Sequence, residues 1–115
     1  MITKETIIEF FNDLKSKEDF NTEAELLWGY FFLDKDTDKL KELSEKLEKD
    51  NYRFVEFFEA EKLNKKDPQE YYLHLEKIEH HTIDSLNERN QYLYKIAEEM
   101  NVSLYDGFDV GNIGE

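Results

Sequence analysis

The chain has 115 residues, with 28 acidic and 15 basic side chains, so its formal net charge is −13 at pH 7. A chain of this length is expected to form one domain with a hydrophobic core. Its nine Phe, seven Tyr and one Trp are the large side chains that acidic disordered proteins lack, so we expect it to fold. The negative charge repels phosphate backbones, which argues against direct binding to nucleic acid.

The composition also restricts the cellular setting. Without cysteine there is no disulfide, no thiolate metal site and no thiol nucleophile. The longest apolar run, 26–33, has eight residues and is too short to cross a bilayer. Charged side chains interrupt the apolar positions of the first twenty residues, which is unlike a secretory signal. These features predict a cytoplasmic protein that does not enter a membrane.

The first predicted element is an amphipathic helix. Thr3 or Thr6 is its expected N-cap, and apolar residues follow at three- and four-residue spacing. These residues are Ile7, Phe10, Phe11 and Leu14. The polar stretch 15–25 is typical of a connector. We therefore divide the chain into residues 1–22, the helix and connector, and residues 23–115, the main domain.

A strand, a helix and a second strand are predicted next. The apolar, aromatic run 26–33 is typical of a central strand. Capping oxygens at Asp34, Asp36 or Thr37 should start the helix. Its apolar face consists of Leu40, Leu43 and Leu47. Residues 52–59 then alternate with a period of two, which indicates the second strand.

The remainder is predicted to be a strand, a helix and a short strand. A turn at 64–68, which contains a proline, leads into a third strand over about 69–80. Thr82 or Asp84 should cap the last helix. Its apolar face consists of Ile83, Leu86, Leu93, Ile96, Ala97 and Met100. A final strand over 102–105 leads to Asp106-Gly107, a dipeptide typical of turns with positive φ.

This order, a helix followed by βαββαβ, indicates an α+β protein. One supersecondary plan fits it, the ferredoxin-like split βαβ sandwich, here with an extra N-terminal amphipathic helix. Right-handed crossovers then place the two later helices on one face of a four-stranded antiparallel sheet.

Strand alternation divides the sheet residues between two faces. We predict that one set faces the crossover helices: Leu27, Phe31, Val55, Phe57, Leu73 and Leu75. The other set would form a second, strongly aromatic face: Trp28, Tyr30, Phe32, Tyr52, Phe54, Phe58, Tyr72 and Ile78. Monomers rarely leave such a patch in water, so we expect the N-terminal helix, the carboxy-terminal segment, a second copy or a partner protein to cover it. Base stacking is disfavoured because the strands carry glutamates instead of cations.

Few residues suggest catalysis or metal binding. His74, Glu76 and His80 share one face of the third predicted strand, but His74 and His80 would lie about 20 Å apart, so exposed histidines are the simpler interpretation. The carboxylate pairs lack a predicted pocket, and the serines lack the glycines of a nucleophile elbow. The glycines do not form a phosphate-binding loop. The sequence therefore predicts a non-enzymatic protein with no catalytic residues, no cofactor and no metal.

Two segments resemble a known family. In residues 40–54, a helix with spaced leucines ends in Glu-Lys-Asp-Asn-Tyr-Arg-Phe before a long pair of strands. Residues 94–108 read Tyr-Lys-Ile-Ala-Glu-Glu-Met-Asn-Val-Ser-Leu-Tyr-Asp-Gly-Phe. Together they resemble the regulator of ribonuclease activity B family, the protein inhibitors of ribonuclease E, whose domains end in a helix and a Tyr-Asp-Gly-aromatic turn. The resemblance covers about residues 24–111, and the preceding helix also has a counterpart in that family.

The resemblance implies a ferredoxin-like fold and a regulator that binds an endoribonuclease, or its scaffold, and lowers its RNA-cleaving activity. The expected partner is thus a protein, and the chain is expected to be a monomer or a homodimer. We expect partner binding around the Tyr-Asp-Gly-Phe motif and the neighbouring helix end, at Tyr105, Asp106, Phe108, Asp109, Glu98 and Glu99. The alternatives are an immunity-type or other acidic binding module, or a dimeric ligand-binding domain.

Overall fold

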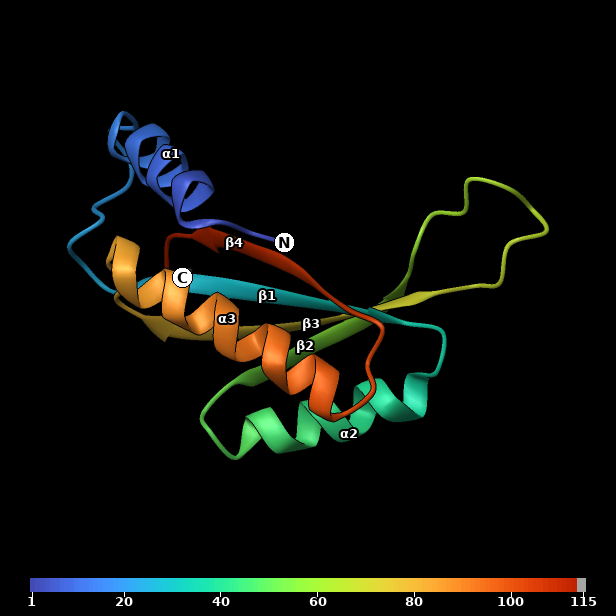
Figure 1. The fold of residues 1–115 in the computed structure, drawn as a ribbon. Coiled ribbons are helices and arrows are strands. Elements are labelled where there is room, and N and C mark those ends of the chain that lie inside the picture. Colours follow the sequence, from blue (N-terminus) through green and yellow to red (C-terminus); the bar gives the residue numbers. More distant parts are fainter. Residues whose placement is uncertain (114–115) are drawn as a thin grey trace.

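The computed structural model describes residues 1–113, and residues 114 and 115, at the end of the predicted main domain, lie outside this description. The described residues form α1 (Lys4–Lys15), β1 (Leu26–Asp34), α2 (Thr37–Glu48), β2 (Arg53–Glu59), β3 (Tyr71–Glu79), α3 (Ile83–Glu99) and β4 (Leu104–Gly111). The strands form one sheet in the order β2-β3-β1-β4, and every neighbouring pair is antiparallel (Figure 1). The predicted ferredoxin-like sandwich with an additional N-terminal helix is confirmed.

Each helix begins at one of the predicted caps. The side chains of Thr3, Asp36 and Thr82 each accept a hydrogen bond from a backbone N–H in the first turn of α1, α2 and α3, respectively. These bonds satisfy donors that have no partner inside the helix. Asn101 follows α3 with a φ of 56°, a left-handed conformation that ends the helix.

The centre of the sheet supplies the largest buried side chains. Trp28, Tyr30 and Phe32 of β1 are each 1% exposed or less, and they lie beneath the helices. Tyr30 pairs with Leu75 of β3, and Phe32 pairs with Leu73. Directly paired residues point to the same face of a sheet, so these aromatic and aliphatic side chains form one core layer. The prediction that the three aromatic residues face away from the helices is therefore wrong, because it assumed a different register.

A bulge in β2 changes the alternation of that strand. The register with β3 shifts between Phe54 and Glu56, which leaves Val55 without a partner residue. Phe54 and Phe57 consequently lie on the same side, against α2. The predicted placement of Phe54 on the second face is wrong for this reason, and so is that of Tyr52, which is buried just before the strand.

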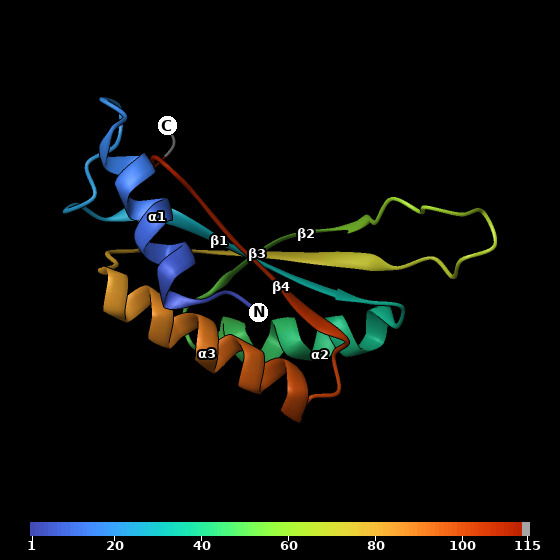
Figure 2. The same cartoon turned by 45° about the horizontal axis from the view of Figure 1, so that its top comes forward.

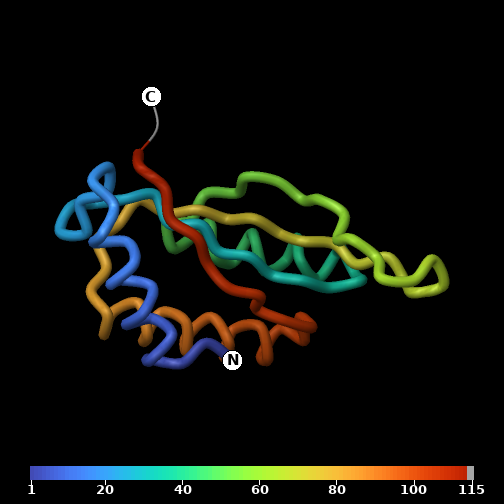
Figure 3. The backbone as a smooth tube through the Cα atoms, turned by 90° about the horizontal axis from the view of Figure 1, so that it is seen from above, coloured from blue at the N-terminus to red at the C-terminus, as the bar shows by residue number. Residues whose placement is uncertain are grey.

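The N-terminal helix does not cover the second face. The rings of Phe10 and Phe11 lie 6.1 and 6.2 Å from that of Trp28, and Phe10 packs edge-on against Phe108 of β4 at 5.0 Å. Since Trp28 belongs to the core layer, α1 lies on the same side of the sheet as α3 (Figure 3). It covers the β4 end of that side.

The other face of the sheet has no helix over it among residues 1–113. Figure 2 shows α2 and α3 together on one side of the strands. Leu27 and Phe31, which were predicted to face the helices, are on the opposite side, because they pair with Ile78 and His74 of β3. The apolar residues here are partly exposed: Leu27, Phe31, Leu33, Phe58, Tyr72 and Ile78. We call this surface the open face.

The last strand is longer than predicted. β4 continues to Gly111, and Asp106-Gly107 lies inside it instead of forming the turn that closes it. Phe31 pairs with Gly107 and Phe32 with Tyr105, so Asp106 is the extra residue of a second bulge. The expectation of a positive φ is nevertheless confirmed at Gly107, at 136°. This value, rather than a chain reversal, explains why a glycine stands there.

Gly107→Ala should therefore lower the free energy of unfolding by about 1–3 kcal/mol, because a Cβ makes that backbone conformation strained. A Cβ there would not collide with a neighbour, since the nearest atom lies 3.7 Å away, at an ordinary van der Waals distance. Gly111→Ala, in the same strand, is the control: a Cβ there meets no atom within 4 Å and needs no positive φ. Urea unfolding measures both variants, and equal stability of the two would contradict the assigned strain.

Candidate functional site

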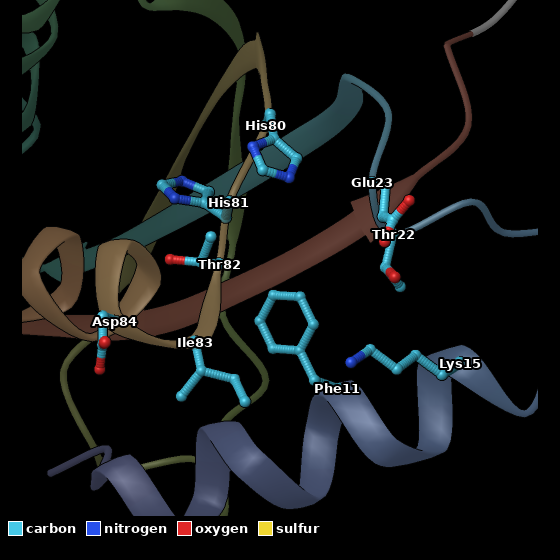
Figure 4. Close-up of a pocket in the computed structure, with 9 residues that line it drawn as sticks. All are labelled: Phe11, Lys15, Thr22, Glu23, His80, His81, Thr82, Ile83 and Asp84. Atoms are coloured by element: carbon cyan, nitrogen blue, oxygen red, sulfur yellow. The ribbon is translucent and has the colours of Figure 1, made fainter.

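The structure presents two regions where polar side chains gather. The first is a hollow of about 560 Å³ between the end of α1, the connector and the turn from β3 to α3. Figure 4 shows the Phe11 ring and the Lys15 ammonium on one wall and His80, His81 and Thr82 on the other. His80 is exposed, whereas His81 is buried at the back of the hollow.

Behind this hollow, a buried network joins β1, β3 and α3. The Tyr30 hydroxyl donates to Glu79 Oε2 at 2.7 Å, and Arg89 Nη1 donates to the same oxygen at 2.7 Å. His81 Nε2 lies 2.9 Å from the Tyr30 oxygen, and its Nδ1 lies 2.9 Å from Ser85 Oγ. Each polar side chain of the network therefore has a partner inside the protein.

The surroundings of Glu79 and Tyr30 shift the pKa of each group. Burial opposes the ionisation of Glu79, but hydrogen bonds from His81, Arg89 and Tyr30 outweigh it and lower the pKa of Glu79 to about 2. Burial, reinforced by the Glu79 charge, raises the pKa of Tyr30 far above its ordinary value. A carboxylate that is ionised and a phenol that is neutral near pH 7 keep their hydrogen bond without exchanging a proton, so this pair joins β1 to β3 and stabilises the fold.

The second region is the open face, where two pairs of rings stack. Phe31 of β1 stacks on His74 of β3, with centroids 4.4 Å apart and planes 20° from parallel. Phe58 of β2 stacks on Tyr72 of β3, at 5.1 Å and 25°. Neighbouring strands thus hold these rings in fixed positions while leaving them in contact with solvent.

Carboxylates of β4 border the stacked rings. A Cβ at Gly29 would collide with Asp109 Oδ1 and lie 2.9 Å from His74 Nε2, so both side chains lean over this glycine. Burial and the adjacent Asp106 carboxylate raise the pKa of Tyr72. The close approach of these side chains to the backbone is possible because position 29 has no Cβ.

A further carboxylate of this face is compensated. Glu76 is only 7% exposed, and it forms an ion pair with Arg53 of β2, whose own side chain is largely exposed. Asp106 and Asp109 are exposed, and they leave the rim of the open face negative. The open face therefore combines stacked rings with exposed carboxylates that form no ion pair within residues 1–113.

The residues predicted for partner binding lie in four places. Tyr105 is 1% exposed, and its hydroxyl donates to Asn90 of α3, so it belongs to the core. Phe108 is half-buried under Phe10 of α1. Asp106 and Asp109 lie exposed on the open face. The remaining pair, Glu98 and Glu99, lies exposed at the end of α3 in the helix layer.

Sequence reasoning missed the pair Phe31 and His74. Their stacking follows from the register of β1 against β3, and alternation within each strand does not reveal that register. Within residues 1–113, no group of three His, Asp or Glu side chains has the geometry of a metal site. No helix in this part of the chain combines the length and hydrophobicity that crossing a bilayer requires.

Fold and surface together define a small acidic α+β sandwich whose polar and aromatic side chains gather on an exposed sheet face. A comparison with protein families matches residues 3–110 to the family described as Regulator of ribonuclease activity B, RraB. This match spans nearly the whole chain, so the chain belongs to the RraB family of ribonuclease regulators. A search of curated proteins finds no match.

Glu79→Gln should lower the free energy of unfolding by about 1–3 kcal/mol near pH 7. Because the pKa of Glu79 is lower in the folded chain than in the unfolded chain, its stabilisation is complete above about pH 5. It is lost as the pH falls toward 2, where the carboxylate becomes protonated. The difference between wild type and variant should therefore shrink over that range in urea unfolding.

The exposed Glu88→Gln, on the same helix as Arg89, is the matched control and should leave stability nearly unchanged. A difference between wild type and Glu79→Gln that stays constant from pH 7 to about pH 2 would contradict a stabilising charge at Glu79.

Proposed function

We propose that this chain is a non-enzymatic regulator that lowers the activity of an endoribonuclease by binding the enzyme, or a protein that scaffolds it, through the open face. Membership in the RraB family supports the regulatory role. The observation that carries the choice of surface is a sheet face with no helix over it among residues 1–113, on which stacked rings are bordered by carboxylates. A cytoplasmic location is part of this proposal.

The open face has the properties of a protein contact. Aromatic side chains provide much of the binding energy in protein interfaces, and rings that are already stacked lose little conformational freedom on binding. The exposed Asp106 and Asp109 add a negative rim to a chain whose net charge is −13. This charge favours a partner surface with lysines and arginines, and it accelerates their encounter.

The two exposed pairs of predicted binding residues allow a charge-matched test. Asp106→Asn with Asp109→Asn, and Glu98→Gln with Glu99→Gln, each remove the same charge from opposite layers of the molecule. We expect the first double variant to weaken binding to the purified ribonuclease E-type enzyme of the same organism by about tenfold or more, and to weaken inhibition of RNA cleavage in parallel. The second should bind like the wild type.

Calorimetry and a gel assay of RNA cleavage measure these effects. If both double variants lose affinity equally, net charge rather than the open face determines binding. If only the Glu98 and Glu99 variant loses affinity, the site lies at the end of α3 and the proposal is wrong.

Gly29→Ala tests the same surface without removing any of its side chains. The added methyl group must displace the Asp109 carboxylate, which is the end of an exposed side chain, and it presses on the edge of the stacked His74 ring. We therefore expect a nearly native unfolding transition together with weakened ribonuclease binding. Unchanged binding would show that the placement of these two side chains does not matter to the partner.

Dimerisation is the competing use of the open face. Light scattering of the wild type and of Phe31→Ala separates the two, because Phe31 is at the centre of this face. We expect a monomer in both cases, with loss of ribonuclease binding in the variant. A wild-type dimer that dissociates on this substitution would assign the face to self-association.

A further inference from the structure

One border of the sheet is left without a cover. In the order β2-β3-β1-β4 the two edge strands are β2 and β4. At β4 the half-buried Phe108 is packed beneath Phe10 of α1. No described element packs over the outer edge of β2 in this way. The side chains of Phe54, Phe57 and Phe58 are 38%, 38% and 37% exposed. The two edges of the same sheet are thus treated differently.

The backbone of β2 has polar groups that point away from the sheet. The N–H of Ala60, just after the strand, donates to Glu70 O at 2.9 Å, so position 60 points toward β3. The direction of the backbone N–H and C=O groups alternates along a strand. Those of Phe58 therefore also point toward β3, whereas those of Phe57 and Glu59 point away from the sheet. Among residues 1–113 no strand pairs with this outer side. An edge of this kind is a template for an added strand.

A groove runs along this edge on the helix side. It has a volume of about 200 Å³ and lies between α2 and β2, where it is lined by Lys41, Ser44, Glu45, Glu48, Phe54 and Phe57. The rings of Phe54 and Phe57 pack together at its base, with centroids 5.0 Å apart. A strand added beside β2 would place alternate side chains next to these rings.

The charges around the groove are mostly negative. Glu45 and Glu48 of α2 and Glu59 of β2 are exposed. The opposing charges are Lys41 on α2 and Arg53 on β2, and Arg53 is already paired with Glu76. The edge therefore favours a cationic strand and disfavours an acidic one.

We propose that the β2 edge binds an extended segment of a partner protein in which apolar residues alternate with lysine or arginine, as a fifth strand of the sheet. Main-chain hydrogen bonds to Phe57 and Glu59 hold the segment, its apolar side chains enter the groove beside Phe54 and Phe57, and its cations meet the glutamates of α2. This surface is separate from the stacked rings of the open face, and its occupation does not depend on the ribonuclease being the partner.

A second copy of the chain is the less suitable occupant. Pairing two β2 strands would bring the glutamates of both copies together, and each copy has a net charge of −13. Like charges placed opposite one another destabilise a strand pair. Charge complementarity therefore favours a basic segment over self-association.

The test uses fluorescence polarisation with the full chain and a labelled peptide of about ten residues, in which Lys alternates with Val and Phe. We expect saturable binding that weakens with added salt. A peptide with Glu in place of Lys should not bind. A peptide with the same composition, but with its lysines and apolar residues in separate blocks, should bind at least about tenfold more weakly, because it cannot direct apolar side chains to one face.

Two substitutions at position 59 separate the contribution of main-chain hydrogen bonds to peptide binding from the contribution of charge. Glu59→Pro removes an outward N–H while leaving the bonds to β3, and Glu59→Gln removes only the charge. We expect Glu59→Pro to weaken binding at least about tenfold more than Glu59→Gln, with similar thermal unfolding of the two variants.

Equal affinity of the two variants for the alternating peptide would overturn the proposed strand addition, because attraction between charges would then explain the binding without main-chain hydrogen bonds. Absence of binding by the alternating peptide would also overturn it. A wild-type dimer that Glu59→Pro disrupts would assign the edge to a second copy and contradict the proposal. If the two variants unfold differently, the test instead uses wild-type protein and a peptide whose backbone nitrogens facing β2 are N-methylated. Unweakened binding of this peptide would show that main-chain hydrogen bonds to β2 do not hold the segment, and it would contradict the proposal.

Discussion

The structure depends on the pairing of β1 between β3 and β4. This register sets Tyr30 opposite Leu75 and Phe32 opposite Leu73, which brings the large rings of β1 under the helices. The hydrophobic layer that results also receives Ile7, Phe11 and Leu14 of α1, so the N-terminal helix shares one core with the sandwich. A shift of β1 by one residue would expose Trp28, Tyr30 and Phe32 and bury Phe31 and Leu33 instead, with a large loss of buried apolar area.

Charged groups reinforce this register at both ends of β1. At one end, the buried Asp34 accepts hydrogen bonds from the backbone of Asp36 and from Ser103, which connects the end of β1 to the starts of α2 and β4. At the other end, Glu79 joins Tyr30 to Arg89 of α3. Burial acts against both carboxylates, yet their hydrogen bonds lower the pKa of each. Both carboxylates thus stabilise the fold through hydrogen bonds between elements that are distant in the chain.

Placing all three helices on one side has consequences for binding. The open face keeps rings that the sheet holds rigid, and the β2 edge keeps unpaired backbone and a groove. Both surfaces carry carboxylates, in keeping with the acidic composition of the chain. The open face suits a folded partner surface, whereas the edge suits an extended segment, so a single small domain is equipped for two kinds of contact.

The sequence by itself determined the order of the elements and the resemblance to the family, and it narrowed each helix cap to two or three nearby residues, because these depend on residues close together in the chain. The structure then shows that Thr3, Asp36 and Thr82 are the caps. It also singled out Asp106 and Asp109, which are exposed, but it grouped them with Tyr105, which is buried in the core. Only the tertiary structure decided which side of β1 faces the helices, where α1 packs and that Asp106-Gly107 forms a bulge instead of a turn. The physical reason is that strand register and bulges arise from pairing between distant segments, and alternation within one strand is compatible with either face.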